Sequence, residues 1–349
     1  MLVTRQYHLD WLRVIAIGLL LLYHVTIGFQ KWGLMIGFIT NGESLDSIWP
    51  PMTMLNVWRI PLLFFVSGMG VYFAIQKRDW RQLLKERTIR IFIPYLFGII
   101  AIVPIHIYLL QRFYNFETNY TANASHLWFL GNIFTYVILL LPFFTYLKKH
   151  IDGRLAVWIK RAFSNPFGLL IVISFFIMET LFVKSGIYEM YASTWHGFFL
   201  GLIGFFFGFC FVFTGISFWN MILKWRWLFL LLAISLYVYR LFQIQMQVPN
   251  FQLAIESNFW IFSAFAFAYK YLNHPCKILN YLSQAAYPVY IVHMMVLYSA
   301  SYIIFPINIP VQLKFLIVLL VTIVGSFIFY EILIRRIKYI RPLFGLKIK

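Results

Sequence analysis

The sequence predicts an all-α, polytopic membrane protein: a bundle of about ten transmembrane helices with both termini in the cytoplasm. Of its 349 residues, 62% are hydrophobic and only 11% are charged, and the mean hydropathy is +0.79. Soluble domains carry roughly 25% charged residues, so this chain lacks the polar surface that water requires. Apolar runs close to the length of a bilayer crossing, about 20 residues, recur from Val14 to Leu333. Lys and Arg are concentrated in every second connection between these runs.

The apolar runs define the expected helices. We expect them at residues 10–29, 55–76, 91–111, 127–147, 166–184, 197–218, 227–246, 255–271, 285–305 and 314–334. No low-complexity linker divides the chain, so we expect a single domain over residues 1–349.

The alternation of positive charge gives the orientation. One set of connections is densely basic: Arg5, 77–90, 148–161, 224–226, Lys277 and 335–349. The other set is nearly devoid of Lys and Arg: 31–51, 112–125, 184–194, 247–254 and 306–312. Cytoplasmic loops carry the excess of Lys and Arg. We therefore assign the first set and both termini to the cytoplasmic side of a plasma or inner membrane.

Charge and cysteine content exclude several classes. The net charge of +18 does not indicate nucleic-acid binding, because no soluble segment is long enough to carry a continuous basic surface. The two cysteines, Cys210 and Cys276, provide neither a disulfide framework nor the spacing of a CxxC or Cys/His metal site. We expect no metal and no permanently bound cofactor.

Ionisable residues inside apolar runs are the main functional candidates, because a charged group in hydrocarbon costs several kcal/mol. The first helix carries Asp10, Arg13 and His24. Arg13 and His24 are eleven residues apart, about 20° from a whole number of turns, so they share a face and stand roughly 16 Å apart along the helix. Asp10 can pair with Arg13 at the i, i+3 spacing.

The spacing leaves two interpretations of these residues open. His24, near or just past the midplane, is either a general base or a neutral side chain bonded to a neighbouring helix. Arg13 is either part of a site or a basic residue that extends its side chain to the interface.

Arg87 and Arg90 lie one turn apart where a basic, amphipathic segment runs into the third helix. Two guanidinium groups on one face are suited to binding phosphate, as in a coenzyme A donor. The alternative is that the segment lies on anionic lipid.

Six more polar or aromatic residues are weaker candidates for an acceptor site or a path through the bundle: Arg59, Ser67, His126, Trp128, His293 and Glu331. Arg59 is alternatively an anchor at the outer end of its helix, and Glu331 alternatively pairs with the arginines that follow it. Near Ser67, Gly70 is expected to serve close helix packing.

Glu179 and Arg240 lie inside the fifth and seventh expected helices. We expect them to compensate each other's charge.

Six sequence blocks, in order from residue 9 to residue 345, resemble those of the membrane-bound acyltransferase 3 family. They are Leu9-Asp10-Trp11-Leu12-Arg13 with His24 (Arg-x10-His), 59–68 (Pro-Leu-Phe-Phe-x-x-Ser-Gly), Arg87-Thr88-Ile89-Arg90 (Arg-x-x-Arg), 126–130 (His-Leu-Trp-Phe), Tyr290-Ile291-Val292-His293, and 331–345. The second-helix and closing blocks resemble the glucan-modifying branch, which includes glucan biosynthesis protein C.

The resemblance implies an O-acyltransferase that moves an acetyl or succinyl type of acyl group from cytoplasmic acyl-CoA to a carbohydrate hydroxyl on the other side of the membrane. We then expect His24, Arg13 and Asp10 in catalysis and Arg87 and Arg90 on the donor phosphates. The expected partners are acyl-CoA as co-substrate, a glycan acceptor and membrane lipid. A homo-oligomer is left open.

A secondary transporter or flippase for an anionic metabolite or glycolipid is the rival interpretation. It too would place Arg and His inside helices. The basic helix start at Arg87 and Arg90 favours the acyltransferase, since a transporter does not need it.

Overall fold

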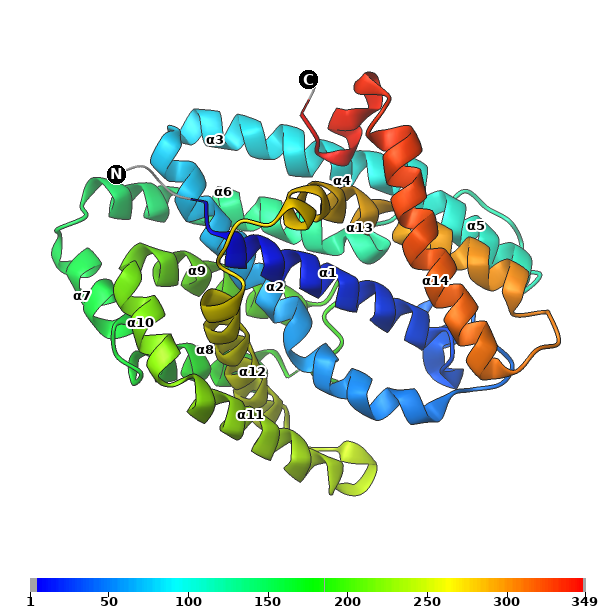
Figure 1. Ribbon diagram of the computed structural model, residues 1–349, viewed down its shortest axis with the longest axis horizontal. Helices are drawn as coiled ribbons and strands as arrows, with labels where there is room; N and C mark the ends of the chain where they lie inside the picture. Colours follow the sequence, from blue (N-terminus) through cyan, green and yellow to red (C-terminus); the bar gives the residue numbers. More distant parts are fainter. Residues whose placement is uncertain (1–4, 185, 348–349) are drawn as a thin grey trace. The chain divides into compact units, whose positions relative to one another are not determined.

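The structure is a computed structural model that describes residues 5–184 and 186–347 (Figure 1). All regular secondary structure in these residues is helical, so the predicted all-α class is confirmed. The last two residues of the basic tail, 348–349, lie outside the described residues.

The α-helices carry most of the chain. They are α1 (Tyr7–Ile27), α2 (Trp49–Lys77), α3 (Trp80–Arg87), α4 (Ile93–Phe97), α5 (Val103–Phe113), α6 (Trp128–Lys149), α7 (Arg154–Phe163), α8 (Gly168–Val183), α9 (Trp195–Thr214), α10 (Ile216–Lys224), α11 (Arg226–Leu241), α12 (Asn250–Tyr271), α13 (Lys277–Ile304) and α14 (Val311–Phe329).

Shorter 3₁₀ and π-helical segments link or extend these helices. They are η1 (Lys31–Ile36), η2 (Asp46–Ile48), η3 (Thr88–Phe92), η4 (Gly98–Ile102), η5 (Ser125–Leu127), η6 (Ile244–Met246), η7 (Tyr330–Ile334) and η8 (Lys338–Phe344). Of these, η3, η4 and η7 are π-helical. π-Helical turns are rare and are found frequently at functional sites.

Seven helical segments within the described ranges are long and apolar enough to cross a membrane. The number becomes nine if two bent pairs each count as one span: α7 with α8, bent by 94°, and α10 with α11, bent by 59°. The chain is therefore a multi-pass membrane protein. The remaining predicted helix, 255–271, lies within α12, which has 22 residues and is more polar because it includes Glu256 and Asn258.

Two features differ from the predicted helix boundaries. The predicted helix 197–218 ends at Thr214, because Gly215 has φ +79° and breaks the chain direction before α10. The basic connection 148–161 contains a further helix, α7, which the sequence analysis missed. It buries Ala156, Ile159 and Phe163 and exposes Arg154 and Arg161, so its apolar face is too short to resemble a membrane span.

The chain divides into two compact units, each described by itself. Unit 1 comprises residues 1–16, 54–86 and 132–279, and unit 2 comprises residues 17–53, 87–131 and 280–349. The division passes through α1 after Ala16, so this helix contributes to both units.

Unit 1 is organised around α8, α9, α11 and α12, with α11 and α12 side by side (Figure 1). Its core is rich in aromatic rings. Phe65 of α2 stacks on Phe176 and Phe211, with centroid distances of 5.9 and 5.6 Å, and meets Phe265 edge-on. Offset and edge-on arrangements are the favourable geometries for such rings.

Glycines set the distance between α2 and α9. A Cβ atom added at Gly68 would lie 1.9 Å from the Phe205 carbonyl oxygen, and one at Gly208 would lie 2.1 Å from the Phe65 carbonyl oxygen. At Gly70 the nearest atom would be Arg13 Nη2, at an ordinary 3.8 Å. The packing role expected for Gly70 is therefore wrong; Gly68 has that role.

Gly68→Ala is expected to destabilise the protein, because the two backbones must separate to admit a methyl group. Overpacking of this kind typically costs about 1–3 kcal/mol. Thermal unfolding of the detergent-solubilised protein measures the effect, with Gly70→Ala as the matched control on the same helix. Equal melting temperatures for the two variants would contradict the assignment.

Unit 2 has its core between α1, α13 and α14. Buried residues of this core come from all three helices and from the segment after α1: Val25, Ile27, Phe29, Phe38, Ile39, Met294, Leu297, Tyr298, Ala300, Phe305, Val311 and Val318. The sequence expectation that 31–51, 112–125 and 306–312 share one side is consistent with contacts here. The backbone N–H of Thr40 donates to the Tyr114 hydroxyl at 2.9 Å, and Lys314 donates to Asn41 and to the Phe305 carbonyl.

Candidate active site

Four histidines of unit 2 form a continuous row of rings. His24 of α1 stacks on His293 of α13, with centroids 5.1 Å apart and planes 6° from parallel. His293 meets His126 of η5 edge-on at 5.1 Å, and His126 meets His106 of α5 at 5.6 Å. His293 has no exposed surface, and His106 and His126 are buried. The row brings together side chains from four segments that are far apart in the sequence.

The hydrogen bonds of His293 determine its tautomer. Its Nδ1 lies 2.6 Å from the Tyr290 carbonyl oxygen, which can only accept, so Nδ1 carries the hydrogen. In the neutral ring, Nε2 is then the acceptor. His24 Nδ1 lies 2.9 Å from this Nε2 and must donate to it. The basic lone pair of His24 is therefore on Nε2.

His126 and His106 form the other half of the row. His126 Nε2 donates to the Ile291 carbonyl oxygen at 3.1 Å, which leaves its Nδ1 as the acceptor nitrogen. The Tyr290 hydroxyl donates to the His126 carbonyl oxygen and so ties η5 to α13. His106 Nε2 lies 3.1 Å from the Ser125 hydroxyl. The row is thus fixed by the backbone carbonyls of Tyr290 and Ile291, in the turn of α13 before His293.

The row does not form a metal centre in the described part of the chain. No group of three or more His, Cys, Asp or Glu side chains there has an arrangement that would hold a metal ion. The hydrogen bonds explain this for His126 and His293, because each directs one ring nitrogen to a main-chain carbonyl.

Two arginines lie at the other end of unit 2. Arg87 ends α3 and Arg90 lies in η3; both are half-buried. This helical segment continues through α4 and η4 to His106 in α5. Sixteen residues separate Arg90 from His106, which corresponds to about 24 Å along a helix. A ligand that bound the two arginines and also reached His106 would need a long arm.

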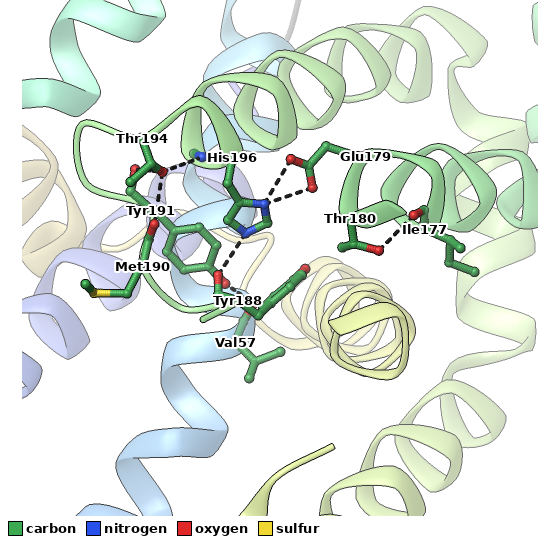
Figure 2. Close-up of polar contacts among 10 residues, drawn as sticks. Val57, Ile177, Glu179, Thr180, Tyr188, Met190, Tyr191, Thr194 and His196 are labelled. Atoms are coloured by element: carbon green, nitrogen blue, oxygen red, sulfur yellow. Dashed lines mark hydrogen bonds and ion pairs between the residues drawn. The ribbon is translucent and has the colours of Figure 1, made fainter. Parts of the chain in front are cut away.

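Unit 1 contains a second buried polar network, shown in Figure 2. His196 of α9 lies between Glu179 and Tyr188. Its Nδ1 is 2.9 Å from both carboxylate oxygens of Glu179, and its Nε2 is 2.8 Å from the Tyr188 carbonyl oxygen. The two side chains of the pair are at most 2% exposed. Through these contacts His196 connects α9 to α8 and to the segment between them.

Arg240 has its own partners in unit 1. It pairs with Glu256 at 2.9 Å and with Glu189 at 3.5 Å. The predicted mutual compensation of Glu179 and Arg240 is therefore wrong, because His196 occupies the Glu179 carboxylate. Burial raises the pKa of Glu189, which lies in the connection between α8 and α9, and Arg240 opposes that effect.

The connection between α8 and α9 is held by these groups. The Tyr191 hydroxyl donates to the Val57 carbonyl oxygen at 2.9 Å, and the Thr194 hydroxyl caps α9 by accepting from the Gly197 N–H at 3.0 Å (Figure 2). Burial raises the pKa of the Tyr188 phenol well above its ordinary value, so this group stays protonated. The network therefore stabilises the connection between α8 and α9.

Comparison with known proteins decides the family. Residues 6–331 match the family described as an acyltransferase domain, which is nearly the whole chain. The chain belongs to the acyltransferase 3 family. It is therefore a membrane O-acyltransferase. Neither a curated protein nor a solved structure matches it.

In this acyltransferase, three of the predicted site residues meet: His24, His126 and His293. Trp128, buried at the start of α6, follows His126 by two residues. Arg13 and Asp10 form the predicted i, i+3 pair, at 3.6 Å, and Asp10 also pairs with Arg5 at 2.8 Å. These two residues lie in the part of α1 that belongs to unit 1.

The remaining candidates have local partners in the acyltransferase. Arg59 is 1% exposed and donates to Asn56 at 3.3 Å, and Ser67 donates to the Leu63 carbonyl oxygen of its own helix. Glu331 pairs with Arg335 at 2.8 Å, which is the ion pair that the sequence analysis left open.

Sequence reasoning missed His106 and His196. His106 lies inside the predicted helix 91–111, and the rule that selected His24 would have selected it as well. His196 lies one residue before the predicted start of its helix. A polar side chain outside an apolar run is not selected as a functional candidate.

Proposed function

We propose that the chain transfers an acyl group of the acetyl or succinyl type from cytoplasmic acyl-CoA to a carbohydrate hydroxyl on the other side of the membrane, with His24 at the reaction centre. The observation that carries the proposal is the relay from His24 to His293 and the Tyr290 carbonyl. This relay fixes the tautomer of His24 and gives its Nε2 the lone pair that acyl transfer needs.

The reaction balances at that nitrogen. Nε2 takes the proton of the acceptor hydroxyl while the hydroxyl oxygen attacks the thioester carbonyl carbon. The carbon–sulfur bond breaks, and the coenzyme A thiolate takes the proton back from Nε2. If Nε2 instead attacks the carbonyl first, the carbon–sulfur bond breaks, the coenzyme A thiolate leaves and an acylimidazolium forms. The acceptor oxygen then displaces the ring, and the thiolate takes the hydroxyl proton. Both routes use the same lone pair.

His293 has the supporting role in either route. When Nε2 accepts a proton, His24 becomes an imidazolium, and its Nδ1–H bond to His293 strengthens because the donor is then charged. His293 also holds the ring orientation, since its own Nδ1 is fixed to Tyr290. It is a positioning residue, comparable in geometry to the third member of a hydrolase triad.

The separation of the two ends of unit 2 supports a coenzyme A donor. Arg87 and Arg90 would hold its phosphates, and their planar guanidinium groups suit that task. The reactive thioester must then extend to the histidine row, whose member on this helical segment, His106, lies about 24 Å further along it. Coenzyme A carries its acyl group at the end of a long flexible arm, whereas a small acyl phosphate would not reach.

The acceptor is proposed to bind beside the histidine row of unit 2. His126 and Trp128 are the residues proposed to shape its site. An aromatic ring and polar side chains are suited to binding a sugar, whose ring has apolar faces and a hydroxyl edge. Asp10 and Arg13 are proposed to guide the donor arm at the cytoplasmic start of α1.

Binding of acetyl-CoA and succinyl-CoA to the purified protein in nanodiscs tests the function. We expect saturable binding, and release of free coenzyme A when a glycan acceptor is added. Mass analysis of cell-surface glycans with and without the gene identifies the acyl group and the acceptor. No acyl-CoA binding, combined with saturable solute flux in proteoliposomes, would instead support the transporter.

His293→Asn is expected to lower kcat by about 10–100-fold, the usual loss when an orienting partner is removed. The KM for acyl-CoA should stay close to the wild-type value, because His293 bonds to Tyr290 and His24 and not to the proposed phosphate site. Steady-state kinetics of His293→Asn measure this, with His150→Asn as the control at an exposed position. An unchanged kcat in His293→Asn would remove the relay from the mechanism.

A further inference from the structure

The C-terminal segment of unit 2 docks onto the turn that carries Arg90. After α14 and η7, the chain forms η8, which packs against η3 and α4. Phe344 is 3% exposed and meets Phe97 of α4 edge-on at 5.4 Å. The tail is therefore part of the folded unit and lies at the same end as Arg87 and Arg90.

Gly345 allows the C-terminal turn to pack closely against Arg90 and Tyr287. Its φ of +73° favours glycine, and an added Cβ would lie 2.4 Å from the Tyr287 ring and 2.8 Å from the Arg90 carbonyl oxygen. Two backbone hydrogen bonds complete the turn, from Gly345 N–H to the Pro342 carbonyl and from Leu346 N–H to the Arg341 carbonyl. The turn 341–346 is thereby fixed directly on the backbone of Arg90.

This end of unit 2 is strongly positive. Its segments 87–92 and 330–347 contain seven basic residues: Arg87, Arg90, Arg335, Arg336, Lys338, Arg341 and Lys347. They contain one carboxylate, Glu331, so the net charge is +6 (7 − 1). Glu331 is engaged by Arg335. A fold that gathers this much like charge on docked segments is suited to a polyanion.

Arg341 is the half-buried basic residue that the docked turn brings to this end. Its Nε is buried and has no hydrogen-bond partner among the described residues, and its guanidinium lies within electrostatic range of buried Tyr330. Arg336 and Lys338, in the same tail, are exposed. A buried guanidinium N–H without an acceptor is costly, so a bound anion would stabilise it.

We propose that Arg341 is a third phosphate-binding arginine of the donor site, and that Gly345 holds the turn which presents it. This inference rests on the proposed function. The C-terminal segment is then a determinant of donor affinity, and Arg341 acts on binding of the phosphate-bearing end of acyl-CoA and not on the reaction at His24. Its ligand chemistry is a phosphate group, which coenzyme A and anionic lipid both carry.

Kinetics and binding in nanodiscs of neutral lipid test the proposal. Arg341→Ala is expected to raise the Kd for coenzyme A and the KM for acyl-CoA by about 10–100-fold, the effect of losing a charge-assisted hydrogen bond. kcat should not change. Transfer from acyl-pantetheine, which has no phosphate, should proceed at the wild-type rate. Arg336→Ala, at an exposed position of the same tail, is the matched control and should bind coenzyme A normally.

Two further variants separate a binding role from a folding role. Arg341→Lys keeps the charge and loses the planar fork, so its Kd should lie between those of wild type and Arg341→Ala. Gly345→Ala should raise the Kd as Arg341→Ala does. Gly37→Ala should not, although Gly37 also has a positive φ, of 83°, because nothing lies within 4 Å of an added Cβ there.

The outcomes are distinguishable. A wild-type protein that binds no coenzyme A would overturn the proposed function together with this inference. A wild type that binds coenzyme A, with Arg341→Ala binding it equally well, would overturn the inference alone. If Arg341→Ala weakens binding only in nanodiscs that contain anionic lipid, the arginine serves a lipid phosphate and the donor assignment is wrong.

Discussion

His24→Ala is expected to lower the rate of acyl transfer by about 10²–10⁴-fold, the usual contribution of a positioned general base. The variant loses the nitrogen that receives the acceptor proton, and the neighbouring imidazoles are held at other positions. His293 directs Nδ1 to the Tyr290 carbonyl and Nε2 to His24, and His126 directs Nε2 to the Ile291 carbonyl. The rate at saturating acyl-CoA, normalised to the amount of folded protein, measures the effect.

Two controls make this result specific. His150→Ala and His274→Ala remove exposed histidines of unit 1 and should leave the rate unchanged. The Kd for coenzyme A should also stay near the wild-type value in His24→Ala, because the proposed phosphate site is at the other end of unit 2. Full activity of His24→Ala at a normal protein level would exclude His24 from the chemistry.

Breaking the Glu179–His196 pair is expected to have the largest effect on stability. The pair is at most 2% exposed, so either single variant leaves a buried charge or a buried polar group without its partner. Removing one partner of a buried pair typically costs about 3–5 kcal/mol. We expect His196→Ala and Glu179→Leu each to lower the melting temperature and the yield of folded protein.

The double variant and an exposed pair provide the comparison. The double variant, His196→Ala with Glu179→Leu, should lose less stability than the sum of the two single losses. It removes both side chains, so neither member of the pair is left buried without its partner. Arg335→Ala breaks the exposed pair with Glu331 and should change the melting temperature little. Additive losses in the double variant would show that the two side chains do not act together.

Features that depend on one helix could be predicted from the sequence. Apolar runs of bilayer length located most of the spans, and the i, i+3 spacing predicted the Asp10–Arg13 pair, which is confirmed. His24, His126 and His293 were selected one at a time, because an ionisable side chain in an apolar run is costly wherever it lies. None of these arguments requires knowledge of the neighbouring helix.

Contacts between distant segments could not be predicted in this way. His24 and His293 are 269 residues apart, and periodicity gives only the face on which each lies, not the helix that it meets. The same gap led to the wrong partner for Glu179, which binds a histidine 17 residues away and not Arg240. It also led to the prediction of Gly70, and not Gly68, as the packing glycine. The sequence does not show which of the two faces the backbone of the other helix.

Nitrogen-15 spectra of histidine-labelled protein in nanodiscs test the relay most directly, with His24→Gln used to assign the His24 signals. The structure predicts that the neutral ring of His24 carries its hydrogen on Nδ1 and not on Nε2, and that His293 also carries its hydrogen on Nδ1. This result would agree with a base, or a nucleophile, at His24 Nε2. A hydrogen found on Nε2 of His24 in the neutral ring would contradict the relay and the mechanism built on it.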